Sequence, residues 1–132
     1  MSISTTPRAE SPSTDFFDIL ENKAEFIGRD LVVADSLART TYRGPITEIK
    51  KPQSSSQNNP LVIIVGWRAS RPFDGEKQDW RLAKDEPFRY SIELSRTTFR
   101  LDEDGSLAIK EYRGLDATIL PADATSLVKP TS

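Results

Sequence analysis

Strict two-residue alternation is the feature that most restricts the fold of this chain. Every even-numbered residue from Phe88 to Leu94 is apolar, and every odd-numbered residue up to Ser95 is polar or charged. Successive side chains of a β-strand point to opposite faces of the sheet, so this pattern predicts a strand with one buried face. The alternation resumes at Phe99 and Leu101, which predicts a further strand.

Three other segments complete the predicted fold. Residues 61–65 are apolar throughout and predict a strand buried on both faces, while Asp102–Gly105 has the residues of a hairpin turn. Residues 15–27 carry apolar side chains at helical spacing and end at Gly28, which predicts a helix. The expected fold is mainly β: a small antiparallel barrel or rolled sheet of 6–8 short strands with one N-terminal amphipathic helix.

The 132 residues suffice for one domain of ordinary size. We expect residues 15–120 to form a single β-barrel-like domain between two polar, disordered tails, 1–14 and 121–132. No stretch approaches the ~18 consecutive apolar residues of a membrane helix, and the first residues have no apolar core of a secretory signal. The expected location is therefore cytoplasmic, with an organelle lumen as the open alternative.

The chain has no cysteine and no histidine. This excludes thiol nucleophiles, the usual zinc sites and every catalytic arrangement built on histidine. An enzyme would have to rely on carboxylates such as Glu93, Asp102 and Asp104, and no pattern in the sequence separates their pKa values. The acidic turn lacks the twelve-residue ligand series of a calcium loop. We therefore expect no catalytic residue, metal or cofactor.

The segment from residue 40 to residue 50 must change the face that it buries. Tyr42 and Ile46 share one parity along the strand, whereas Ile49 has the other. Gly44–Pro45 is the place where a bulge is easiest, because glycine tolerates it and proline cannot donate a ladder hydrogen bond. The proline also predicts that this side of the strand is an exposed sheet edge.

Positive charge is concentrated in the middle of a chain whose net charge is −2. Between Ser36 and Phe73 there are six cations and one acid, Glu48. If the two strands of this region are neighbours, the cations share one surface with exposed aromatic rings. The candidate surface consists of Arg39, Tyr42, Arg43, Lys50, Lys51, Trp67, Arg68 and Arg71.

Two binding functions fit this surface, and so does a third interpretation without any binding function. Complementary charges on basic and acidic parts suit a non-catalytic module that docks in a protein assembly, with a protein partner or a second copy of the chain. Arginines beside aromatic rings also suit phosphate contact and base stacking in RNA. Charges placed only for solubility are the third reading. The first is the leading hypothesis, and a nucleic-acid-binding small barrel, Sm-like or OB-like, is the alternative.

One resemblance bears on the RNA alternative. A helix followed by residues 27–33 (IGRDLVV) and 42–49 (YRGPITEI) is similar to the first half of an Sm-like barrel. The resemblance implies a five-stranded barrel, a ring-shaped oligomer and RNA binding. In the second half, Arg113–Gly114 is the Arg–Gly pair that stands where the family's closing strand would lie, and the predicted strands are more numerous than five.

Overall fold

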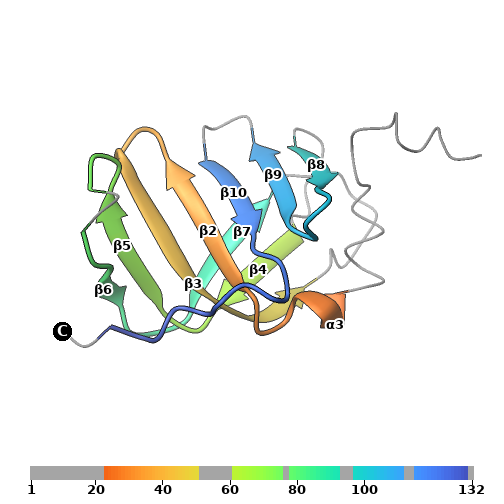
Figure 1. Ribbon diagram of the computed structural model, residues 1–132, viewed down its shortest axis with the longest axis horizontal. Helices are drawn as coiled ribbons and strands as arrows, with labels where there is room; N and C mark the ends of the chain where they lie inside the picture. Colours follow the sequence, from red (N-terminus) through yellow and green to blue (C-terminus); the bar gives the residue numbers. More distant parts are fainter. Residues whose placement is uncertain (1–22, 51–60, 76–77, 93–96, 112–114, 131–132) are drawn as a thin grey trace, which may run out of the picture.

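The computed structural model describes residues 23–50, 61–75, 78–92, 97–111 and 115–130 (Figure 1). Their elements are α3 (Lys23–Phe26), β2 (Asp30–Asp35), β3 (Thr40–Lys50), β4 (Leu61–Val65), β5 (Arg68–Pro72), β6 (Arg81–Lys84), β7 (Phe88–Ile92), β8 (Thr97–Leu101), β9 (Leu107–Glu111) and β10 (Leu115–Ile119). The fold is mainly β, as predicted. No helix in the described ranges is long and apolar enough to cross a membrane.

The nine strands form one antiparallel sheet that branches at β3. The main part has the order β6-β5-β3-β2-β10-β9-β8, and β4 and β7 form the branch. Residues 40–43 of β3 pair with β5, whereas residues 46–50 pair with β4. In Figure 1 the branch runs behind the main part, so the sheet has an inner face between the two parts and an outer face.

Of the two predicted forms, a small barrel or a rolled sheet, the barrel is wrong because the sheet is open, and the sheet has nine described strands instead of the predicted six to eight. Among the described strands, β6, β7 and β8 each pair with one neighbour only. The branch explains the difference: β3 gives its two halves to two different partners, and the chain therefore forms two facing parts instead of one continuous ring.

The predicted N-terminal helix is not supported either. Its described part is a single turn, Lys23–Phe26, and residues 15–22 lie outside the described residues. After this turn Gly28 adopts a positive φ of 91°, as its place in the sequence predicted. The Gly28 N–H then donates to the Ile46 carbonyl, and Ile46 N–H donates to the Arg29 carbonyl, so the chain joins the sheet.

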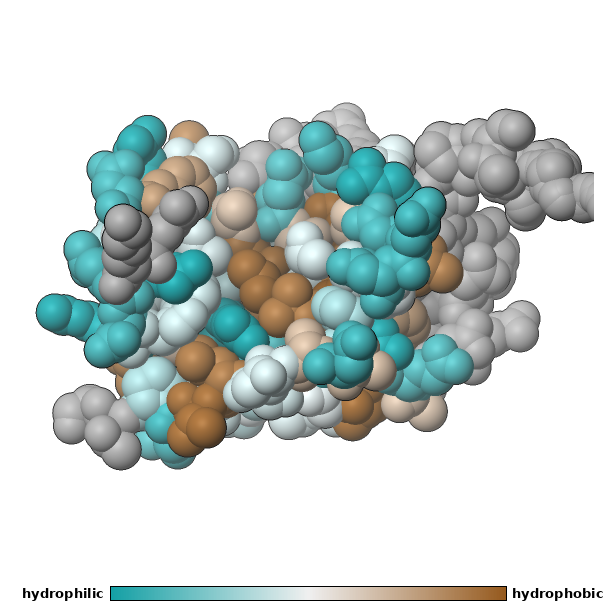
Figure 2. All heavy atoms as spheres, in the orientation of Figure 1, coloured by the Kyte–Doolittle hydropathy of each residue, from teal (hydrophilic) through white to brown (hydrophobic). Residues whose placement is uncertain are grey.

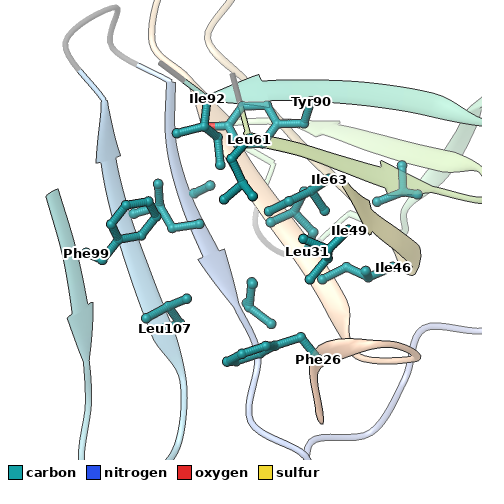
Figure 3. Packing of buried hydrophobic residues seen from close by; sticks show 14 residues of the cluster. Phe26, Leu31, Ile46, Ile49, Leu61, Ile63, Tyr90, Ile92, Phe99 and Leu107 are labelled. Atoms are coloured by element: carbon teal, nitrogen blue, oxygen red, sulfur yellow. The ribbon is translucent and has the colours of Figure 1, made fainter. Parts of the chain in front are cut away.

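The hydrophobic core fills the space between the two parts of the sheet. Figure 3 shows Leu61, Ile63, Tyr90 and Ile92 of the branch near Phe99 and Leu107 of the main part. Leu61, Ile63, Ile92 and Leu107 are fully buried. Burial of each such side chain contributes about 1.5–3 kcal/mol, so this core is the main source of stability.

Strand β3 changes its buried face at Thr47. Ile46 and Ile49 are both buried, which confirms the predicted change, and the register shifts between Ile46 and Glu48, not at the predicted Gly44–Pro45. Gly44 has a different role: a Cβ at this position would overlap the Trp67 carbonyl oxygen.

The edge expected at Pro45 is wrong, because β3 has partners on both sides. β2 pairs along one side, and β5 and then β4 pair along the other. Pro45 lies where the partner on that side of β3 changes from β5 to β4. At this position the ladder needs no N–H donor, so a proline is tolerated.

Residues 120–130, for which the sequence predicts a disordered tail from 121, follow the lower edge of the main part (Figure 1). Leu120 N–H donates to the Asp30 carbonyl, and Leu127 N–H donates to the Asp30 side chain at 2.9 Å. Lys129 forms an ion pair of 2.6 Å with Asp85 beyond β6. The segment thus connects β2 with the region after β6.

Candidate binding surfaces

The predicted basic surface is divided between the two faces of the sheet. Arg43 and Arg71 lie on the outer face, because Arg71 pairs with Thr41 and shares its parity. Tyr42 and Arg68 lie on the inner face, where the Arg68 guanidinium carbon is 4.2 Å from the centroid of the Tyr42 ring. Side chains of adjacent strand residues point to opposite faces, so one continuous surface was impossible for this set.

Arg43 is held in a buried ion pair. Its Nε donates to Asp30 Oδ2 at 2.7 Å, and the two side chains are 17% and 2% exposed. Arg43 Nη2 also donates to the Thr125 carbonyl at 2.9 Å, while Leu127 N–H donates to the same Asp30 oxygen. These bonds make Arg43 a structural link between β2, β3 and the C-terminal segment.

Two arginines lie against Trp80 on the outer face, and we call Arg43, Arg71 and Trp80 the outer cluster. The guanidinium carbon of Arg71 is 4.3 Å from the Trp80 ring centroid, and that of Arg43 is 5.9 Å away. In the described part of the chain no acid forms an ion pair with Arg71 or Arg81. Arg71 and Arg81 line a polar depression of about 380 Å³ together with Asp79. Arg81 pairs with Ser70, the register partner of Tyr42, so its side chain points to the inner face and is not part of the outer cluster.

An apolar patch lies beside the outer cluster. Figure 2 shows hydrophobic residues at the centre of this face, with hydrophilic residues on both sides. Val32 and Ala34 of β2 point outward here, since Leu31 is buried and Val33 packs against the core. Both are half-buried, and Val32 is the register partner of Arg43. Arginines and half-buried apolar side chains therefore occur together on this face.

Arg68 occupies an unusual position on the inner face. Its guanidinium carbon is 3.9 Å from the Phe88 ring centroid, in addition to its contact with Tyr42. Its Nε is buried and has no hydrogen-bond partner among the described residues. Burial lowers the pKa of Arg68, while the charges of Tyr42 and Asp35 act in the opposite direction. The side chain is thus a partly desolvated cation without a direct counter-ion in this part of the chain.

A cavity of about 110 Å³ adjoins Arg68, between β2, β3 and β10 on one side and β4, β5 and β7 on the other. We call it the inner cavity. Its innermost residues, Leu31, Val65 and Tyr90, are buried, and the Tyr90 hydroxyl donates to the Leu115 carbonyl at 2.8 Å. The half-buried lining residues are Val33, Asp35, Tyr42, Arg68, Phe88 and Leu115, and Arg43 and Gly44 complete the wall.

The remaining candidate residues lie elsewhere. Arg39 is exposed, stacks 5.9 Å from the Phe73 ring and forms an exposed ion pair of 3.7 Å with Asp74. Lys50 is exposed at the end of β3, and Trp67 is half-buried between β4 and β5. Lys51 lies outside the described residues.

Several residues of these surfaces were not predicted from the sequence. Trp80 precedes the weakly patterned β6 and Arg81 is its first residue, and Phe88 was assigned to the core side of its strand. Asp30 and Thr125 have partners 13 and 82 positions away in the sequence. The cations near Trp80 in the sequence could have indicated its place in the basic surface. No feature of the sequence indicates the contacts of Asp30 and Thr125.

The acidic turn between β8 and β9 has internal hydrogen bonds. Asp104 Oδ1 accepts from Ser106 N at 2.9 Å and from Ser106 Oγ at 2.6 Å, and these bonds lower the pKa of Asp104. Asp102 Oδ1 accepts from Arg100 Nε at 2.8 Å. No group of three or more potential metal ligands occurs within the described ranges.

Comparisons with protein-family models, with curated proteins and with solved structures found no match for this chain.

Proposed function

We propose that the chain is a non-catalytic β-sheet module that binds an acidic segment of a protein partner on its outer face. The observation that carries this proposal is the outer cluster, in which Arg71 lies 4.3 Å from Trp80 without an ion-pair partner among the described residues. A cation held over an aromatic ring keeps its orientation and loses little freedom when a carboxylate binds it. Arginine and tryptophan are also enriched in the energetic centres of protein interfaces.

The neighbouring apolar patch supports a protein partner rather than RNA. An acidic segment that also carries apolar side chains can contact Arg71 and cover Val32 and Ala34 at once. Base stacking would instead need a free aromatic face, and arginines already lie against the Trp80 ring.

Selection of peptides tests the proposal. Random twelve-residue peptides displayed on phage are panned on the chain and on an Arg71→Glu variant. We expect acidic peptides with at least one apolar residue to be enriched on the chain and to be lost on the variant. Arg43 is left intact in this design because its ion pair with Asp30 stabilises the fold.

Two results would contradict the proposal. One is an absence of enrichment on the unmodified chain. The other is binding of a labelled mixed-sequence 20-mer RNA at micromolar concentration, with a log–log salt slope near about −3, which would indicate contact with about four phosphates.

A further inference from the structure

We infer that the inner cavity binds a free α-amino acid with a branched aliphatic side chain, such as leucine. Two oppositely charged groups, Arg68 and Asp35, line an otherwise apolar cavity. This combination matches the three parts of such a ligand: a carboxylate, an ammonium group and a hydrocarbon side chain. The site lies on the inner face, so the inference does not depend on the protein partner proposed for the outer face.

Arg68 would hold the carboxylate. Its Nε–H is buried and lacks an acceptor among the described residues, and a buried donor without a partner is costly. A ligand carboxylate would supply that acceptor and a charge-assisted hydrogen bond. The contacts with Tyr42 and Phe88, at 4.2 Å and 3.9 Å, fix the guanidinium in place before the ligand arrives.

Asp35 would hold the ammonium group. Its Oδ1 accepts from Leu37 N–H and Ala38 N–H, both at 3.1 Å, which anchors the carboxylate at the end of β2. The same acid also excludes a simple fatty carboxylate as the best ligand, because its charge would repel a ligand that has no cation.

The size of the cavity indicates the side chain. Its volume of about 110 Å³ is roughly three-quarters of the ~150 Å³ of a cavity that holds benzene. A four-carbon branched group fits this space better than an aromatic ring. Leu31, Val65 and Leu115 would surround it with apolar contacts.

Titrations followed by protein NMR test the inference with three matched ligands. Leucine has both charges, N-acetyl-leucine has only the carboxylate, and leucinamide has only the ammonium group. For leucine we expect saturable shifts of the Val33, Tyr42 and Phe88 amide signals, with a Kd near about 1 mM. Each capped ligand should bind at least about tenfold more weakly, which corresponds to the loss of one charged contact.

Two variants test the assigned roles. Arg68→Met keeps the hydrocarbon stem between the rings, and Asp35→Asn keeps the Oδ1 acceptor of the turn. Each should weaken leucine binding by at least about tenfold. The comparison of ligands needs no variant, so the test holds even if one of them fails to fold.

The inference is overturned if leucine gives no saturable shift up to about 20 mM. It is also overturned if N-acetyl-leucine or leucinamide binds as tightly as leucine, because the site would then recognise a peptide end. Peptides on phage are fused at their C-terminus and offer no free amino acid, so failure of the panning experiment is distinguishable from failure here.

Discussion

At the scale of single residues, the positive charges of this chain have different physical roles. Arg43 forms a buried ion pair with Asp30. Arg71 lies against Trp80 and has no ion-pair partner among the described residues, and Arg68 is a half-buried cation that lines the inner cavity. A count of charged residues in the sequence cannot distinguish these three roles of arginine. Burial and partners separate the structural Arg43 from Arg68 and Arg71, the two arginines on which the proposed binding sites rest.

The Arg43→Met substitution should destabilise the fold by about 3 kcal/mol, because it leaves the Asp30 carboxylate buried without its counter-ion. Urea unfolding measures the change. The matched control is Arg71→Met on the same face, which should cost no more than about 1 kcal/mol because only a contact with Trp80 is lost. Adding Asp30→Asn to Arg43→Met should restore part of the stability. Equal costs for the two arginine variants would refute the structural role of Arg43.

At the scale of elements, the alternating segments were predictable and the joints between them were not. Tyr90 and Ile92 are buried and Arg89 and Ser91 exposed, as the period-two pattern predicts. Local sequence determines such a pattern, because successive side chains of a strand point alternately to the two faces of the sheet. The face change in β3 was also predictable, but its position at Thr47 depends on the partner strand β4, which local sequence does not specify.

Of the two short elements, the hairpin was predictable from local sequence and the helix was not. The hairpin at Asp102–Gly105 followed from turn chemistry, and Gly105 has the expected positive φ of 92°. The helix expected over residues 15–27 rested on helical spacing of apolar residues and on Gly28 as its end, and its described part is one turn. Four residues are too few to form a helix without tertiary contacts.

The turn between β8 and β9 gives a prediction about pH. Hydrogen bonds from the Ser106 side chain and backbone lower the pKa of Asp104. Because the folded-state pKa is depressed, ionised Asp104 stabilises the fold above its ordinary pKa of about 3.9. This contribution is lost as the pH falls through the lowered value.

The Ser106→Ala variant should raise the pKa of Asp104 toward the ordinary value, since it removes the hydroxyl donor at 2.6 Å. NMR titration of the side-chain carboxyl carbon measures it. The backbone donor at 2.9 Å remains, so a part of the depression should persist. An unchanged Asp104 pKa in the variant would show that the hydroxyl is not the main cause.

At the scale of the whole molecule, long-range contacts determine where the candidate sites lie. The branch at β3 creates an inner cavity, and the C-terminal segment covers the Asp30–Arg43 pair. Neither arrangement could be derived from local patterns, because each depends on contacts between residues that are not neighbours in the sequence. The sequence did identify Tyr42, Arg68 and Arg71 as candidates, but it could not assign them to different faces before the strand pairing was known.

Removal of residues 123–132 should lower the free energy of unfolding by about 2–3 kcal/mol, because Asp30 and Arg43 lose hydrogen bonds to Leu127 and Thr125. Chemical denaturation measures the effect. Lys129→Ala in the full chain removes only an exposed ion pair and should cost less than about 1 kcal/mol. A truncated chain with unchanged stability would mean that the segment does not hold the pair in solution.

The most direct measurement of the central claim is an NMR titration of the chain with an acidic peptide from the panning experiment, followed through the indole signals of its two tryptophans. The account predicts a saturable shift of the Trp80 signal, which reports on the outer cluster, and little change at Trp67, which has no described arginine contact. A peptide that binds while the Trp80 signal stays in place would contradict the account, because the partner would then occupy another surface.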